Sequence, residues 1–255
     1  MKVRQILTLV SLSFLVLFTS QCSKTADGPG SSSSVTLNTF NNKAVGASAN
    51  ELLSAEKPSI VLEVNYMKGF ALQSSTLNSL NSFLSTYTKK GAFQVVQKEI
   101  TASGKDSLSL AEIDKIERQN RTTFNSTNQV SVYLLVTDGG YNPENTVGFA
   151  YRNTSIVLLG KTISKFSGGA NQVPRSKLEL GTLEHEFGHL FGLVNVGTPM
   201  QTNHNDPANP AHCVNSKCLM YYQTETSRFL GTLMANNIPS FDTNCRNDLI
   251  ANGGK

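Results

Sequence analysis

The chain has 255 residues and a formal net charge of +4, and 39% of its residues are hydrophobic and 16% charged. This composition is typical of an ordinary globular protein and excludes a disordered or fibrous chain. No run of basic residues with interleaved aromatic residues occurs, so the sequence gives no reason to expect a nucleic-acid partner.

The N-terminus has the pattern of an export signal. Two basic residues precede an apolar stretch, Ile6–Phe18, which is short for a membrane span but typical of a secretory signal. The next four residues, Thr-Ser-Gln-Cys, resemble a bacterial lipobox, although Thr and Gln stand where Leu and a small residue are usual. The resemblance implies that residues 1–21 are removed and that Cys22 is lipidated. We therefore expect an exported cell-envelope lipoprotein at the outer membrane, held to the membrane by this lipid; ordinary secretion with an unmodified Cys22 is the alternative.

A polar segment separates this signal from the folded part. Residues 22–57 include Gly28-Pro29-Gly30 and the serine run Ser31–Ser34, a composition that cannot bury a core and that predicts a flexible tether. The folded domain is expected to begin near Pro58 and to continue to residue 255. We expect it to be a monomer.

The first half of this domain alternates strand and helix patterns. A Ser-Leu-Ala-Glu capping box, in which the Ser and Glu side chains satisfy backbone N–H groups, marks the start of one helix at Ser109. A continuous apolar run at Val130–Val136 is typical of a strand buried on both faces of a sheet. In chain order, the patterns predict a strand at 60–66, a helix at 77–87, a strand at 93–100, a helix from 109 to about 124, and a strand at 130–136.

Two short apolar segments follow, at Phe149–Tyr151 and Ser155–Leu159. They fit either a hairpin or one long irregular strand, and we favour a single edge strand over 149–159. The whole succession predicts an α/β (α+β) architecture, in which helices pack on a mixed, twisted sheet.

All four histidines lie between positions 185 and 212, and two of them belong to the sequence His185-Glu186-Phe187-Gly188-His189. On a helix, residues i and i+4 lie one above the other, so His185 and His189 would present two imidazoles to one metal ion. Glu186 would lie close enough to act on a water molecule at that metal. The spacing therefore predicts half of a zinc site.

The sequence after this motif resembles that of the metzincins, in which His-Glu-x-x-His continues with x-x-Gly-x-x-His or Asp. Gly192 stands three residues after His189, at the position where metzincins end the active-site helix in a sharp turn. The third ligand position, however, holds Asn195, and an amide oxygen is a poor zinc ligand. One alternative is therefore a catalytically inactive surface lipoprotein that has kept the fold and acts as a binding module.

Another histidine lies in a segment that resembles archaemetzincins. His212 is followed by Cys-x4-Cys-x-Met, as the third zinc-binding histidine is in that family. The resemblance implies that His212 is the third ligand, that Met220 forms the Met-turn beneath the metal, and that Val194–Ala211 is an insertion. His204 is the competing candidate for the third ligand.

The same resemblance implies a zinc-dependent endopeptidase with a metzincin-like zincin fold, whose mixed sheet has an antiparallel edge strand. Its upper subdomain would span 58–192, and a smaller, mostly helical lower subdomain would span 193–255. Glu186 would be the general base, and Tyr222 matches a tyrosine that some metzincins use to stabilise the oxyanion. The substrate would be a peptide or protein lying antiparallel to the edge strand at 149–159.

Three cysteines remain if Cys22 is lipidated: Cys213, Cys218 and Cys245. In an oxidising compartment, the simplest arrangement is one disulfide and one free thiol. The resemblance offers a structural zinc site instead, in which Asp242 stands where archaemetzincins have a fourth cysteine. Of these two arrangements, we expect the disulfide rather than a Cys3Asp zinc site.

Overall fold

The computed structural model describes residues 42–225, 229–235 and 237–255. The predicted signal, the lipidated Cys22 and most of the predicted tether lie outside the described residues. Within the described part of the chain, no helix has the length and apolar character that a membrane span requires.

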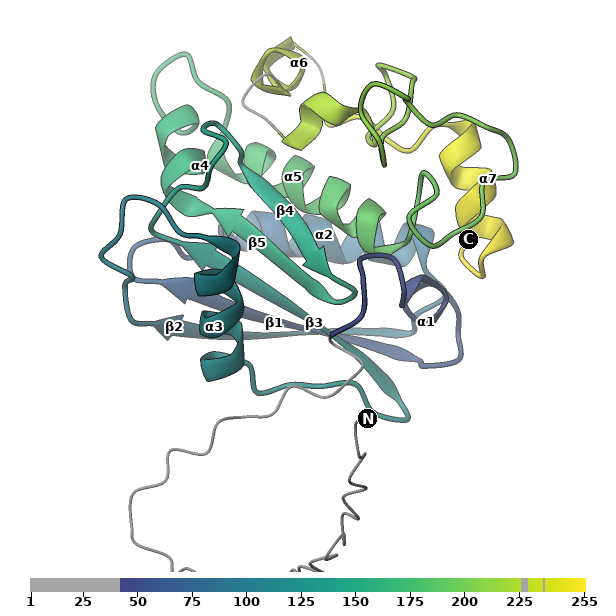
Figure 1. Ribbon diagram of the computed structural model, residues 1–255, viewed down its shortest axis with the longest axis horizontal. Helices are drawn as coiled ribbons and strands as arrows, with labels where there is room; N and C mark the ends of the chain where they lie inside the picture. The colour runs from purple at the N-terminus through teal and green to yellow at the C-terminus, as the bar shows by residue number, and fades with distance from the viewer. Residues whose placement is uncertain (1–41, 226–228, 236) are drawn as a thin grey trace, which may run out of the picture. The chain divides into compact units, whose positions relative to one another are not determined.

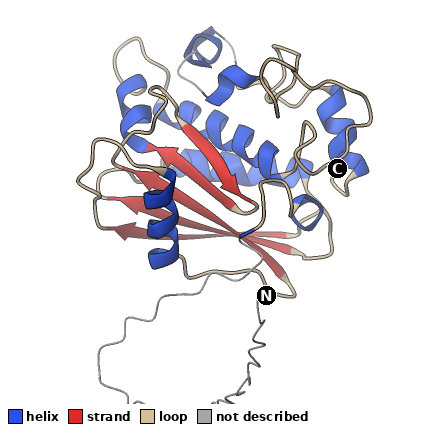
Figure 2. Cartoon of the chain, viewed as in Figure 1, coloured by secondary structure: helices blue, strands red, loops and turns tan. Residues whose placement is uncertain are grey.

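A five-stranded sheet forms the centre of the fold (Figures 1 and 2). The strands are β1 (Ser59–Met67), β2 (Ala92–Ile100), β3 (Gln129–Thr137), β4 (Gly148–Arg152) and β5 (Ser155–Leu159). Their spatial order is β2-β1-β3-β5-β4, and every neighbouring pair is parallel except β4 and β5. The predicted mixed α/β architecture with an antiparallel edge strand is therefore confirmed.

Residues 148–159 form a hairpin rather than the single edge strand that we favoured. β4 pairs antiparallel with β5, and β5 in turn pairs parallel with β3. All five residues of β5 are buried, whereas four of the five residues of β4 are only partly buried. The apolar run at Ile156–Leu159 needs cover on both faces, so it takes an interior position and leaves only β4 on the edge.

The helices are α1 (Ala49–Leu53), α2 (Ser74–Tyr87), α3 (Leu110–Asn120), α4 (Gly160–Phe166), α5 (Arg175–Leu190), the 3-10 helix η2 (Tyr222–Glu225), α6 (Phe229–Ala235) and α7 (Thr243–Ala251). The predicted capping box opens α3, where the Glu112 carboxylate accepts the Ser109 N–H at 2.8 Å. This helix ends at Asn120, before the expected Phe124, because the backbone turns extended at Arg121 and buries that side chain against Glu117.

Two apolar cores lie on the two faces of the sheet. Leu134 of β3 belongs to the larger core, together with residues of α2 and α5 such as Leu84 and Phe187. Tyr133, the neighbour of Leu134, points to the opposite face and belongs to the smaller core, with Ile113 of α3. Accordingly, α2 and α5 lie side by side on one face and α3 covers the other (Figure 1).

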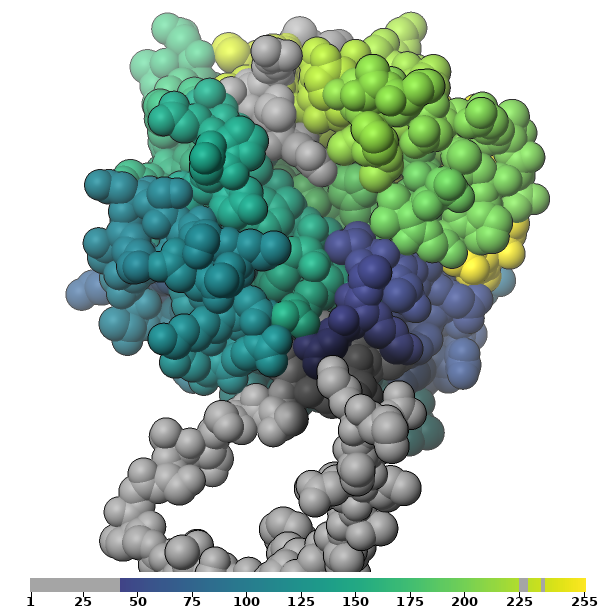
Figure 3. All heavy atoms as spheres, in the orientation of Figure 1, coloured from purple at the N-terminus to yellow at the C-terminus, as the bar shows by residue number. Residues whose placement is uncertain are grey.

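The folded part begins earlier in the chain than the expected boundary at Pro58. Leu52 and Leu53 of α1 are fully buried in the larger core. The carbonyl of Lys43 accepts the Asn153 N–H of the β4–β5 turn at 3.1 Å. On the surface, this first described segment (dark purple) lies between the hairpin and the loop after α5 (Figure 3). The sequence predicts α1 to be part of the tether, because the residues around it are mostly polar and only a few are apolar.

The C-terminal part was expected to be mostly helical. Among its described residues, loops account for most of the chain, and η2, α6 and α7 lie between them. These loops bring residues far apart in the sequence toward α5.

Candidate metal centre

Helix α5 carries the His-Glu-x-x-His motif close to its C-terminal end. His185 and Glu186 are fully buried, and His189 is 7% exposed. The Nε2 atoms of His185 and His189 lie 3.1 Å apart. Two nitrogens bound to one tetrahedral zinc at about 2.0–2.1 Å would lie about 3.3 Å apart, so this separation fits a shared ion.

The chain turns sharply after α5, as the glycine spacing predicts. Gly192 has φ +72°, and a Cβ on it would lie 2.6 Å from the backbone nitrogen of Thr198. Both the left-handed backbone and this close approach require glycine. Val194 and Asn195, the first two residues of the insertion, also have positive φ, at 55° and 64°, so the chain turns away from the helix axis as the insertion begins.

The loop after the insertion brings His212 to the two histidines of α5. The His212 ring is stacked on His185 with a centroid distance of 5.4 Å, and it lies 5.1 Å from the ring of His189. The ligand nitrogens of the three residues all lie within 4.8 Å of one another. His204 belongs to a different cluster, so the geometry places His212 rather than His204 at this centre.

Two backbone carbonyls orient the rings. Nδ1 of His185 donates to the carbonyl of Leu219 at 2.7 Å, and Nδ1 of His212 donates to the carbonyl of Pro210 at 3.0 Å. Each bond fixes the tautomer in which Nε2 carries the lone pair needed to bind a metal. The three residues therefore fit zinc in both spacing and ring orientation. Backbone carbonyls have no sequence signature, so the sequence could not predict these contacts.

Glu186 is held by the edge strand. Its Oε2 accepts the backbone N–H of Ala150 in β4 at 2.8 Å. Since the β4 edge opposite β5 pairs with no described strand, this contact places the free edge of the sheet directly beside the carboxylate.

Met220 and Tyr222 follow the third histidine. Met220 is fully buried, and a Cβ on Gly188 of α5 would lie only 2.2 Å from its sulfur. Met220 thus packs directly beneath the motif helix, as a Met-turn does. Tyr222 opens η2, which packs against α5, and its hydroxyl accepts a hydrogen bond from Gln223 Nε2 at 3.3 Å. Its role at the oxyanion stays a prediction.

The expected disulfide is not formed among the described cysteines. Cys213, Cys218 and Cys245 are all buried free thiols, and the Cys218 and Cys245 sulfurs lie 3.6 Å apart, against about 2.05 Å in a disulfide. His204, Cys213, Asp242 and Cys245 form a second group whose potential ligand atoms lie within 4.8 Å of one another. Hydrogen bonds from the neighbouring thiols lower the pKa of Cys213 well below its usual range.

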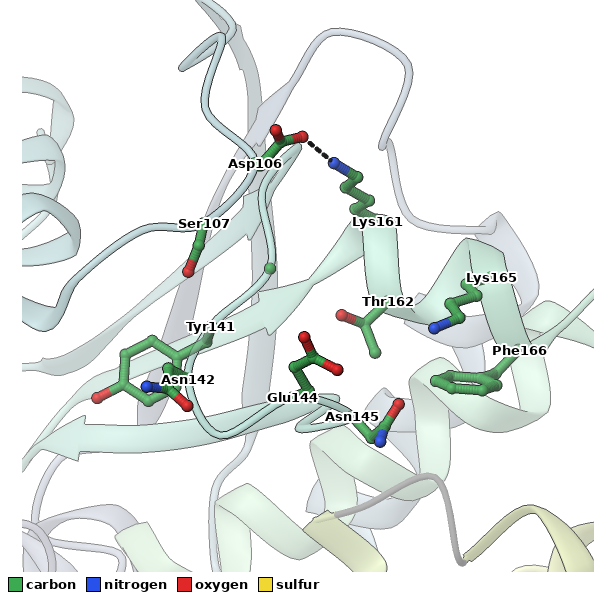
Figure 4. Close-up of a pocket in the computed structure, with 11 residues that line it drawn as sticks. Asp106, Ser107, Tyr141, Asn142, Glu144, Asn145, Lys161, Thr162, Lys165 and Phe166 are labelled. Carbon is green, nitrogen blue, oxygen red and sulfur yellow. Dashed lines mark hydrogen bonds and ion pairs between the residues drawn. The ribbon is translucent and has the colours of Figure 1, made fainter.

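A cavity of about 730 Å³ lies between α4 and the loop that precedes β4 (Figure 4). At its rim, Lys161 forms an ion pair with Asp106 at 2.7 Å. Glu144 and Asn145 of the loop lie near Lys165 and Phe166 of the helix, and Tyr141 and Asn142 line the other side of the cavity. Neither the three histidines nor Glu186 line this cavity, so a metal ion held by the histidines would lie outside it.

Comparisons with known proteins give a likeness in structure alone. No family model matches this sequence, and no curated protein matches it. The archaemetzincin of Methanopyrus kandleri superimposes with a TM-score of 0.52 and 15% identity, over 76% of this chain and 96% of that one. Metalloproteinase-II of Bacteroides fragilis gives a TM-score of 0.42 and 13% identity, over 84% of this chain and 58% of that one. The likeness to the first shows that this chain has an archaemetzincin-like fold.

Proposed function

We propose that the protein is a zinc-dependent endopeptidase. The observation that carries the proposal is the convergence of three imidazoles, His185, His189 and His212, beside a buried glutamate and the free edge of a sheet. Three protein ligands leave a fourth position at zinc for water or substrate, which is the arrangement of catalytic rather than structural zinc sites.

Each residue of the centre has a distinct part in this chemistry. Zinc bound there would act as a Lewis acid for the scissile carbonyl and would lower the pKa of a water molecule. Glu186 takes a proton from the attacking water and returns it to the leaving amine. The Ala150 N–H fixes one oxygen of this carboxylate, so the base keeps its orientation during proton transfer. The Tyr222 hydroxyl is proposed to stabilise the oxyanion.

The edge strand supports a peptide substrate. A peptide that added to β4 in the antiparallel direction would pass the carboxylate at Ala150 and continue toward Gly148. Beyond Gly148 lies the 140–147 segment, several residues of which line the 730 Å³ cavity. This space would take residues that follow the scissile bond, which favours cleavage within a chain over removal of a terminal residue.

Glu186→Gln provides the decisive test, with Glu184→Gln as the matched control on the same helix. We expect Glu186→Gln to slow digestion of a peptide library by about 10²-fold or more while zinc content is unchanged, because only the proton acceptor is lost. Glu184→Gln should keep the rate within a few-fold. Undiminished hydrolysis in Glu186→Gln would refute the mechanism. If the zinc-loaded wild-type protein cleaved no peptide, the binding-module alternative would replace the proposal.

We also propose that the protein is exported and anchored through lipid on Cys22, on the basis of the lipobox-like sequence. Metabolic labelling with a radioactive fatty acid should label the wild-type protein and not Cys22→Ser. Equal labelling of the two would contradict the anchor.

A further inference from the structure

The edge strand is irregular next to the Glu186 carboxylate. In β4, Ala150 and Arg152 lie opposite two consecutive residues of β5, so Tyr151 between them is an additional residue without a counterpart across the pair. Such an arrangement is a β-bulge, which bends a strand and changes the direction of the groups beside it. The group beside it here is the Ala150 N–H, which donates to Oε2 of Glu186 at 2.8 Å.

The sheet holds Tyr151 less firmly than it holds the residues around it. On one side Tyr151 has no counterpart in β5, and on the other side the edge of β4 pairs with no described strand. Because the regular pairing of the backbone is interrupted at this residue, contacts of its side chain have to fix the shape of the bulge.

The Tyr151 side chain is anchored in a buried polar network. Its hydroxyl donates to Oε2 of Glu117 in α3 at 2.5 Å, and Glu117 is fully buried. The other oxygen of this carboxylate accepts from Arg121 and from the Ser155 hydroxyl of β5, each at 2.8 Å. Arg121 donates in turn to the Ser131 carbonyl of β3 at 2.8 Å. The network therefore ties the bulge to a central strand of the sheet.

Tyr151 and Ala150 lie on opposite faces of the sheet. Ala150 packs against the larger core on the side of α5, whereas Tyr151 packs against the smaller core on the side of α3. The two residues share one rigid, planar peptide group, so a displacement of Tyr151 also displaces the backbone of Ala150. The α3 face is in this way connected to the contact with Glu186 on the other face.

We propose that Tyr151 is a positioning residue for peptide hydrolysis: by holding the bulge, its hydrogen bond to Glu117 aims the Ala150 N–H at Glu186. This inference rests on the proposed function, because it concerns the orientation of the general base. A well-placed general base contributes about 10²–10⁴-fold to a rate, and a displacement of about 1 Å can cost about 10²-fold.

The Tyr151 hydroxyl is a donor at neutral pH. Burial and the neighbouring Glu117 carboxylate raise the pKa of Tyr151 well above its usual value of 10.0. The hydroxyl therefore keeps its proton, and Glu117 accepts it. A substitution that removes the hydroxyl is the direct way to break this bond.

Tyr151→Phe removes the hydrogen bond and keeps the ring. In full-length, zinc-loaded protein we expect kcat to fall about tenfold and KM to stay within about twofold, because the base is misplaced while the edge of β4 still binds the peptide. Ser155→Ala is the matched control. It removes another hydroxyl bond to the same carboxylate, but Ser155 is paired with both β3 and β4. This control should keep kcat within about twofold.

Amide hydrogen exchange, measured by NMR, tests the same contact without hydrolysis. In Tyr151→Phe, the Ala150 N–H should exchange faster, because its bond to Glu186 opens more often. The internal reference is the Tyr133 N–H of β3, which donates to the Thr154 carbonyl at 2.8 Å. A loss of overall stability accelerates both amides, so the expected result is an acceleration at Ala150 that exceeds the one at Tyr133 by about tenfold. Ser155→Ala should show no such excess.

Equal acceleration of the two amides in Tyr151→Phe, or an unchanged kcat in this variant, would overturn the proposal. A comparable loss of kcat in Ser155→Ala would also overturn it, because the effect would then come from a general loosening of the network around Glu117. If the wild-type protein cleaved no peptide, the proposed function would fail and the catalytic role of Tyr151 with it. The exchange rates would still decide whether Tyr151 holds the Ala150 N–H.

Discussion

Gly188, within the His-Glu-x-x-His motif, should resist a substitution that normally stabilises a helix. In an open position, Gly→Ala in a helix interior gains about 1 kcal/mol. At Gly188 the new Cβ would lie 2.2 Å from the sulfur of Met220 and 3.1 Å from Cε1 of Phe241. Because carbon contacts settle near about 3.5–4.0 Å, the buried sulfur would have to retreat by about 1.5 Å.

Overpacking of this kind costs about 1–3 kcal/mol, which cancels or exceeds the gain in helix propensity. Gly231 of α6 supplies the control, since nothing lies within 4 Å of a Cβ built on it. We therefore expect Gly188→Ala to be less stable than Gly231→Ala by about 1–3 kcal/mol.

Urea unfolding followed by circular dichroism measures the two free energies, with and without a chelator. The cost at residue 188 should largely vanish in a Met220→Ala background, where no sulfur meets the new methyl group, and the double-mutant cycle isolates that contact. Equal stability of the two alanine variants would show that Met220 does not pack against α5 as described, and the Met-turn assignment would fail with it.

Three further substitutions test the fold and the helix that carries the site. Arg121 and Glu117 form a fully buried ion pair at 2.8 Å. Arg121→Ala should therefore lower the free energy of unfolding, measured with urea, by about 3–5 kcal/mol, because it leaves the Glu117 charge buried without its partner. A decrease of less than about 1 kcal/mol would contradict the burial of this pair. Burial raises the pKa of Glu184 from 4.5 to about 8, so the stability that its neutral form provides is complete below pH 4.5 and is lost as the pH rises through 8. Glu184→Gln should therefore be the more stable protein above pH 8, by at most about 5 kcal/mol, with no advantage at pH 4; a pH-independent difference would refute the shift. Gly192→Ala should lower the free energy of unfolding more than Gly69→Ala does, since both glycines have positive φ but only Gly192 also lacks space for a Cβ. Equal midpoints of the two variants in thermal unfolding would argue against the tight turn.

The motif helix could be predicted because its information is local. His185 and His189 are one helical turn apart, and Gly192 marks the left-handed turn that ends the segment. The same holds for the capping box at Ser109 and for the apolar run of β3. Each of these features depends on side chains within a few residues of one another, so spacing alone reports them.

The rest depends on contacts between distant parts of the chain. His204 and His212 belong to one loop region, and only the fold separates them into two clusters, with His204 meeting Asp248, 44 residues away. The expected disulfide was wrong for the same reason, because distance along the sequence does not show that the thiols of Cys213 and Cys245 lie beside His204. Likewise, Leu52 and Leu53 of α1 are buried because they pack into the larger core, which the short sequence of this helix does not indicate.

The most direct test of the account is anomalous diffraction at the zinc absorption edge from crystals of protein purified without chelators. We predict an anomalous difference peak that lies about 2.0–2.1 Å from each of the Nε2 atoms of His185, His189 and His212. A map with no peak there, or with the His212 ring turned away from the other two, would contradict the metal centre on which the proposed hydrolase depends.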